Sequence, residues 1–255
     1  MRHARIESAT GIYHVILRGI NRQNIFENRN DFKWFEKCLK KVKESCGLKV
    51  FAYCLMSNHA HIVAGVGSEP IGASLKRIGV SYAFWYNNKY NRQGTLFQDR
   101  YISEPVEDDN YLLAVVRYIH QNPIMAGICK TAADYEWSSY ADYIGESDGF
   151  TDTEDVLGLF SENLTNQIRL FEEFTQEAVK GEYVDIDDDV CSSDDAIKDR
   201  IEGICGARSA GEFQSLPPDE REQAIRMMRV SGLSIRQVVR FTGVPFGIVR
   251  MIGKR

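Results

Sequence analysis

The sequence has few prolines and cysteines and no long hydrophobic run. Of its 255 residues, 6 are proline and 6 are cysteine, and no two cysteines form a Cys-x-x-Cys pair. This spacing argues against a zinc ribbon and against a redox dithiol. No apolar run approaches the ~18 residues needed to span a bilayer, and the residues after Met1 lack the apolar core of a signal peptide. We therefore expect a cytoplasmic protein with free thiols and no membrane partner.

The chain also lacks an overall positive charge, although its charge is unevenly distributed. Lys and Arg total 31 and Asp and Glu total 36, which gives a net charge of −5. Residues 1–144 carry 18 basic and 14 acidic side chains, residues 145–203 carry 4 and 18, and residues 204–255 carry 9 and 4. Two mildly basic blocks therefore flank a strongly acidic one. With 44% hydrophobic and 26% charged residues, the composition excludes collagenous and wholly disordered proteins.

The apolar pattern of the first block predicts alternating strands and helices. Runs of β-branched and aromatic residues predict strands over 11–18, 49–56, 61–66 and 101–106. Apolar residues at helical spacing predict helices over 31–46, 71–90 and 108–121. A hairpin turn is expected at Ser57-Asn58, and Pro123 is expected to end the third helix. This order implies an α+β domain with a ferredoxin-like antiparallel sheet and helices packed on one face.

The rest of the chain is predicted to form a connector and a small helical domain. We expect the first domain over 1–145, an acidic connector over 146–199 and an all-α region over 200–255. Helical periodicity over 157–179 predicts that part of the connector folds, whereas the Asp185–Asp189 run favours a solvated segment.

The last residues are patterned as a helix-turn-helix. Helix starts are predicted near Pro217, Ser234 and Pro245, with Gly243 in the turn. Val239, Val244, Val249 and Ile252 would be buried, and the second helix would expose Phe246, Gly247, Arg250 and Lys254. The same pattern also fits a small helical bundle for dimerisation, so monomer and homodimer both stay open.

His59-Ala60-His61 is the sharpest chemical feature of the sequence. Residues i and i+2 of a strand project from the same face, so two imidazoles would lie side by side. This arrangement is half of a metal site. The alternative is two core histidines that are hydrogen-bonded to their neighbours.

Tyr118 and Asn122 provide a second pair of polar side chains. Residues i and i+4 share one face of a helix, so a phenol and an amide would lie together. Near two histidines, they indicate a nucleophile beside a divalent cation. Tyr111 lies on the same helix but has Val115 at i+4. The alternative is an amphipathic core tyrosine followed by an asparagine at a helix end.

The order of several motifs resembles the single-tyrosine transposases of the His-hydrophobe-His (HUH) type, especially the REP-associated tyrosine transposases and their insertion-sequence relatives. The matching segments, in the family's order, are Tyr13-His14-Val15, Asn21-Arg22-Gln23, the run from Tyr53 to Val63, the run from Gly94 to Gln98, the run from Tyr118 to Pro123, and Trp137 to Tyr140. Together they cover about residues 12–143. Met125 stands where the family usually has a basic residue, and Ser57 where proline is common.

This resemblance implies a set of roles. His59 and His61 would bind Mg²⁺ or Mn²⁺, Asn122 would complete the protein ligands, and Tyr118 would be the nucleophile. The implied activity is that of a metal-dependent DNA strand transferase that cleaves and rejoins single-stranded or hairpin DNA through a 5′-phosphotyrosine. No general base is evident, because His120 is two residues from Tyr118 and points away from it on the helix.

Basic side chains in both domains are candidates for phosphate contacts. In the first domain they are Arg18, Arg22 and Arg100; in the last region they are Arg236, Arg240, Arg250 and Lys254, which would contact duplex DNA. Two other functions fit the same sequence. One is a domesticated DNA-binding protein or transcriptional repressor that does not cleave, and the other is a metal-dependent hydrolase of small substrates.

Overall fold

The first part of the chain forms one antiparallel sheet of four strands. The computed structural model describes residues 6–147, 149–177 and 194–252. The strands are β1 (Ile12–Arg18), β2 (Lys49–Met56), β3 (His59–Gly65) and β4 (Ile102–Val106). Their order in the sheet is β2-β3-β1-β4, and every neighbouring pair is antiparallel. The predicted α+β class with an antiparallel ferredoxin-like sheet is confirmed.

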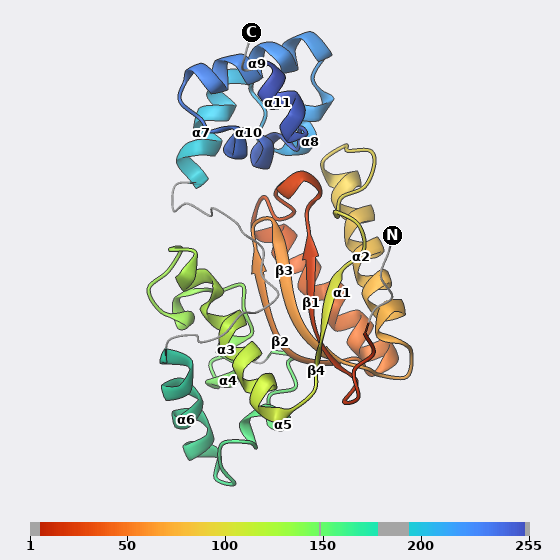
Figure 1. Ribbon diagram of the computed structural model, residues 1–255, viewed down its shortest axis with the longest axis vertical. Coiled ribbons are helices and arrows are strands. Elements are labelled where there is room, and N and C mark those ends of the chain that lie inside the picture. The colour runs from red at the N-terminus through yellow and green to blue at the C-terminus, as the bar shows by residue number, and fades with distance from the viewer. Residues whose placement is uncertain (1–5, 148, 178–193, 253–255) are drawn as a thin grey trace.

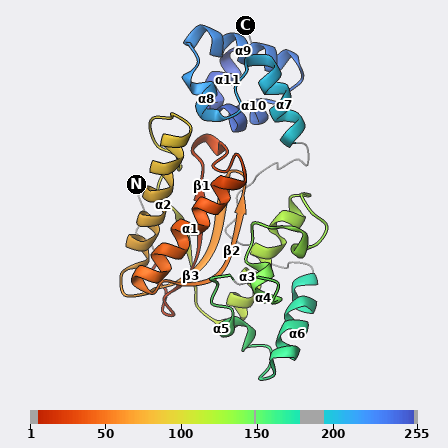
Figure 2. The same cartoon turned by 180° about the vertical axis from the view of Figure 1, so that it is seen from behind.

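Helices cover both faces of this sheet (Figures 1 and 2). The helices α1 (Arg29–Cys46) and α2 (Ile71–Lys89) lie on one face, where the first hydrophobic cluster joins Ala60 and Ile62 to helix residues. The helix α3 (Asp109–Met125) lies on the other face, in a second cluster that contains Val63 and Ile119. The expected placement of all helices on one face is therefore wrong. Every residue of β3 is buried, so the strand needs cover on both sides.

The helix α3 also continues past its predicted end at Pro123. The Asp108 side chain accepts a hydrogen bond from the Tyr111 amide and caps the first turn. Proline removes one backbone donor, and near the end of a helix this loss affects a single hydrogen bond. The helix ends at Met125, and the Gly127 amide then donates to the Ile124 carbonyl oxygen.

Part of the acidic segment packs against α3. The short elements η2 (Ala132–Asp134), α4 (Tyr140–Tyr143) and α5 (Glu154–Leu157) lead to α6 (Leu164–Gln176). Phe171 of α6 is fully buried, and its ring stacks on that of Tyr143 with centroids 4.4 Å apart. The Asp185–Asp189 run lies outside the described residues.

The C-terminal unit is entirely helical in its described part. It consists of α7 (Asp194–Cys205), α8 (Ala210–Ser215), α9 (Pro218–Val230), α10 (Ile235–Thr242) and α11 (Phe246–Ile252). The last three agree with the predicted helix starts. Gly243 joins α10 to α11 at a φ of 68°, and Val239, Val249 and Ile252 are buried. None of the helices in the described parts of the chain is long and apolar enough to cross a membrane.

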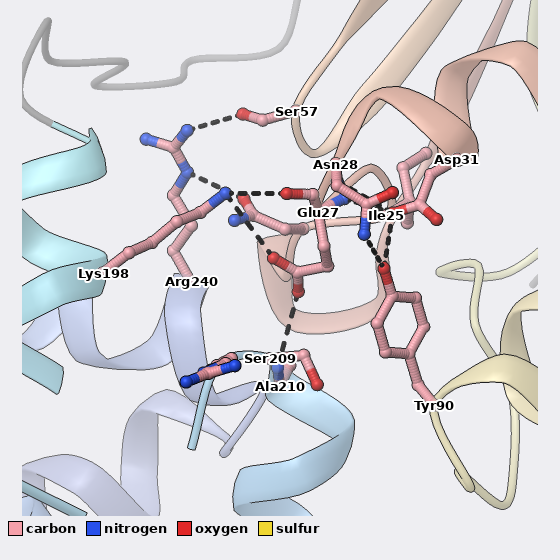
Figure 3. A network of polar contacts seen from close by, with 12 residues as sticks. Ile25, Glu27, Asn28, Asp31, Ser57, Tyr90, Lys198, Ser209, Ala210 and Arg240 are labelled. Atoms are coloured by element: carbon pink, nitrogen blue, oxygen red, sulfur yellow. Dashed lines mark hydrogen bonds and ion pairs between the residues drawn. The ribbon is translucent and has the colours of Figure 1, made fainter. Parts of the chain in front are cut away.

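The C-terminal unit lies over the end of the sheet at which β1 ends and β3 begins (Figure 1). Figure 3 shows the polar contacts that hold it there. The Lys198 ammonium donates to the Glu27 carbonyl oxygen at 3.2 Å, and the Ala210 amide donates to Glu27 Oε1 at 3.4 Å. Arg240 Nη2 donates to Ser57 Oγ at 2.6 Å. Burial of the Glu27 carboxyl raises its pKa.

Candidate active site

The two histidines of β3 project toward the face that α3 covers. The rings of His59 and His61 are 4.8 Å apart and nearly perpendicular. His59 Nδ1 lies 2.7 Å from Asn58 Oδ1, and His61 Nδ1 lies 3.1 Å from His14 Nε2. Because an amide oxygen can only accept, His59 Nδ1 donates to Asn58, which leaves its Nε2 as the nitrogen with a lone pair.

His14 is a site residue that the sequence reasoning did not single out. Ile16 of β1 pairs with His61, so His14, two residues earlier, lies on the same face of the sheet. Burial lowers the pKa of His14 to about 4, which keeps the ring neutral near pH 7. The sequence contains a signal for this residue, the Tyr13-His14-Val15 motif. Placing His14 beside His61 also requires the register between β1 and β3, which the motif does not give.

Tyr118 lies against these imidazoles. Its ring centroid is 5.7 Å from that of His61 and 6.0 Å from that of His14. Asn122 follows one helical turn later on α3. The site is closed, because Tyr118 is 2% exposed, His59 3%, His61 0% and Asn122 8%.

The donor set at this site fits a divalent cation. His61 Nε2 is buried and has no hydrogen-bond partner in the described structure, so a bound cation would satisfy it. Burial and the neighbouring His59 and His14 lower the pKa of His61 well below its usual value, and the neutral ring is the form that binds metal. Within the described residues, no group of three or more His, Cys, Asp or Glu side chains could hold a metal ion.

His120 faces a different part of the protein. Its Nε2 lies 2.8 Å from Ser139 Oγ, and its ring packs edge-on against Tyr140, Tyr143 and Phe171. Burial lowers its pKa to about 3. These contacts agree with the expectation that His120 points away from Tyr118, so the ring supports the fold on the far side of α3.

The predicted phosphate-binding residues of the first domain occupy different places. Arg18 ends β1 directly opposite His59. Arg22 is partly buried in the loop that follows, and Arg100 is exposed just before β4. Two of the three therefore lie at the end of the sheet that carries His59.

The C-terminal candidates differ in exposure. Arg236 and Arg250 are exposed on α10 and α11. Arg240 is only 8% exposed and donates to Ser57 Oγ and, at 3.4 Å, to Asn24 Oδ1. In this arrangement its guanidinium binds the first domain. Lys254 lies outside the described residues.

Comparison with known proteins finds a family to which the N-terminal part is similar. Residues 8–122 match the family model described as "Transposase IS200 like". This segment is therefore similar to the IS200-like transposases. The predicted resemblance to insertion-sequence transposases is thereby confirmed for the segment that contains the sheet, His59, His61 and Tyr118.

Two solved structures are similar to the chain. One is the structure of a REP-associated tyrosine transposase bound to a REP hairpin, with 16% sequence identity, a TM-score of 0.49, and coverage of 60% of this chain and 93% of that one. The other is a putative transposase from Deinococcus radiodurans R1, with 17% identity, a TM-score of 0.35, and coverage of 48% and 97%. No curated protein matches the chain.

Proposed function

We propose that the protein is a metal-dependent DNA strand transferase that cleaves single-stranded or hairpin DNA with Tyr118. The observation that carries this proposal is the position of a tyrosine beside two histidines, one of which has a buried nitrogen that lacks a hydrogen-bond partner in the described structure. A phenol, two imidazoles and an amide on one side of a sheet suit phosphodiester transfer. The family of residues 8–122 supports the same reaction class.

The chain's own groups account for the transfer step. Tyr118 Oη would form a bond to phosphorus, the bond from phosphorus to the 3′ oxygen would break, and the DNA would keep a free 3′-OH. His59, His61 and Asn122 would hold Mg²⁺ or Mn²⁺, which when bound supplies charge stabilisation at the phosphate oxygens and the leaving oxygen. The hydrogen bonds with Asn58 and His14 would keep the two imidazoles oriented for this role.

The closed site sets a condition on this reaction. Because Tyr118 is 2% exposed and both histidines are at most 3% exposed, a phosphodiester cannot reach them in this arrangement. The histidines lie on β3, an inner strand that is paired on both sides. We therefore infer that α3 moves away from the sheet when DNA binds.

The test is covalent capture of the intermediate. Labelled single-stranded and hairpin oligonucleotides incubated with the protein and Mn²⁺ should give an adduct that survives SDS. Trypsin cleaves after Arg117, so peptide 118–130 contains Tyr118 as its one tyrosine, and mass spectrometry can locate the phosphotyrosine there. Tyr118→Phe removes one oxygen and keeps the ring packing, so it should abolish the adduct with little effect on DNA affinity.

The matched control is Tyr111→Phe, a tyrosine on the same helix. This variant should form the adduct at the wild-type rate. An adduct that persists in Tyr118→Phe would refute the nucleophile. Specific DNA binding by the wild type without any adduct in Mg²⁺ or Mn²⁺ would instead favour a non-cleaving DNA-binding protein.

A further inference from the structure

A groove of about 640 Å³ lies between α10 of the C-terminal unit and the loop that follows β1. Arg22 and Asn58 line it from the first domain, and Arg236, Arg240 and Phe246 line it from the C-terminal unit. Its volume falls in the range of about 300–1,000 Å³ that is usual for clefts that hold small molecules. A nucleotide of a single strand would fit in this volume.

The chemistry of this groove matches a nucleic-acid strand. Three guanidinium groups line it, and none of the described lining residues is acidic. Arginine binds phosphate oxygens with two parallel hydrogen bonds. Phe246 is 48% exposed, so an aromatic ring is available for a base to stack on. Amide side chains that could contact base edges also line the groove: Asn21, Gln98 and Gln237.

The groove lies next to the candidate active site. Asn58 lines the groove, and its Oδ1 lies 2.7 Å from His59 Nδ1. The Gly19 amide donates to the Asn58 carbonyl oxygen at 2.9 Å, which fixes the turn next to the end of β1. A strand held in the groove would therefore pass within one residue of a proposed metal ligand.

The loop on the first-domain side of the groove is held in an uncommon conformation. Asn21 and Arg22 have φ values of 53° and 61°, a region that non-glycine residues seldom adopt. Asn21 Nδ2 donates to the Gly243 carbonyl oxygen of the C-terminal unit at 3.0 Å. Strained backbone of this kind persists where surrounding contacts fix it, and it is common at binding sites. Here it fixes the loop that carries Arg22 against the C-terminal unit.

We propose that this groove binds the single-stranded DNA next to the phosphodiester that Tyr118 cleaves. The C-terminal unit then forms one side of the DNA site, with Arg236 on a phosphate and Phe246 stacked on a base. This inference rests on the proposed function for the location of cleavage. The groove itself can be tested without it.

The experiment measures DNA binding in the absence of cleavage. Fluorescence anisotropy would be recorded with full-length Tyr118→Phe protein, EDTA and a labelled single-stranded oligonucleotide at several salt concentrations. Adding Arg236→Gln should reduce the slope of log affinity against log salt by about 0.7, which corresponds to one lost phosphate contact. Adding Phe246→Ala should weaken binding about tenfold, as expected for one lost stack.

Matched controls come from the same unit, outside the groove. Arg226→Gln removes an exposed arginine of α9, and Met227→Ala removes an exposed apolar side chain that is 47% accessible. Both variants should bind single strands as the parent does, and all four variants should keep the parent's thermal melting temperature because the side chains are exposed.

Two results would overturn the proposal. One is single-strand binding by Arg236→Gln and Phe246→Ala that equals that of the controls. The other is a loss of affinity for duplex DNA alone, which would indicate that the C-terminal unit binds duplex DNA. The groove variants could lose single-strand binding while the wild type forms no adduct with Mn²⁺. That result would support DNA binding in the groove and refute cleavage by Tyr118.

Discussion

Replacing Gly243 by alanine should weaken the docking of the C-terminal unit on the first domain. Gly243 has a φ of 68°, in the left-handed region where a residue with a Cβ costs about 1–2 kcal/mol. An added Cβ would lie 2.2 Å from Gln214 Nε2 and 2.5 Å from Gln23 Oε1. Gln214 belongs to the C-terminal unit and Gln23 to the first domain, so the methyl group would push on both sides of the interface.

The cost of moving these amides can be estimated from their contacts. Gln214 Nε2 donates to the Thr242 carbonyl oxygen at 3.0 Å, and Gln23 is fully buried. Losing one such hydrogen bond costs about 1 kcal/mol. Added to the backbone strain, Gly243→Ala should lower the free energy of unfolding of the C-terminal unit by about 2–3 kcal/mol.

Gly206→Ala is the matched control. Gly206 has a φ of 72°, and no atom outside its own neighbourhood lies within 4 Å of the position of an added Cβ. It should lose only the strain of about 1–2 kcal/mol in chemical denaturation. Hydrogen exchange of the Asn24 amide, which donates to the Arg240 carbonyl oxygen at 3.3 Å, should accelerate in Gly243→Ala and not in Gly206→Ala. Equal stability losses and equal Asn24 exchange in the two variants would refute the reasoning.

Three further predictions concern the metal and the interface. His61→Ala should lose the rise in melting temperature that Mn²⁺ gives the wild type, and a retained rise would exclude His61 as a ligand. His14→Phe should weaken Mn²⁺ affinity about 10- to 100-fold in calorimetric titration, because His61 loses the partner that orients it; unchanged affinity would contradict that role. Burial raises the pKa of Glu27 above its usual 4.5, so the wild type should lose stability relative to Glu27→Gln as the pH rises from about 4.5 through the raised value. A stability difference that does not change with pH would show that Glu27 titrates normally in the folded protein.

Local patterns in the sequence were sufficient for the sheet and for the closeness of the main site residues. The strand alternation placed His59 and His61 on one face, and the observed ring separation of 4.8 Å agrees with it. The end of α3 was predicted wrongly, because Pro123 was given more weight than Gly127, which follows the observed end. The second helical layer was missed because the two histidines on one face of β3 did not indicate that this face is buried as well.

Long-range contacts could not be predicted in the same way. Arg240 lies on an amphipathic helix, where an arginine is usually solvated, yet its partners Asn24 and Ser57 are 216 and 183 positions away. His14 and His61 are 47 positions apart, and their hydrogen bond depends on the register of β1 with β3. No periodicity within one element carries that information, so both the interface and the orientation of His61 required the folded chain.

The contacts around the Ser57-Asn58 turn indicate which part of the site moves. Arg240 binds Ser57, Asn58 binds His59, and β3 is paired with β1 and β2, so the histidines are fixed from three directions. By contrast, α3 packs on the sheet largely through apolar contacts, and its Arg117 forms an ion pair with Glu177 at 3.1 Å. Displacement of α3 would open the closed site without moving the histidines. DNA binding in the groove and approach of Tyr118 to the phosphate are then two separate events, and loss of the first should leave the second chemically intact.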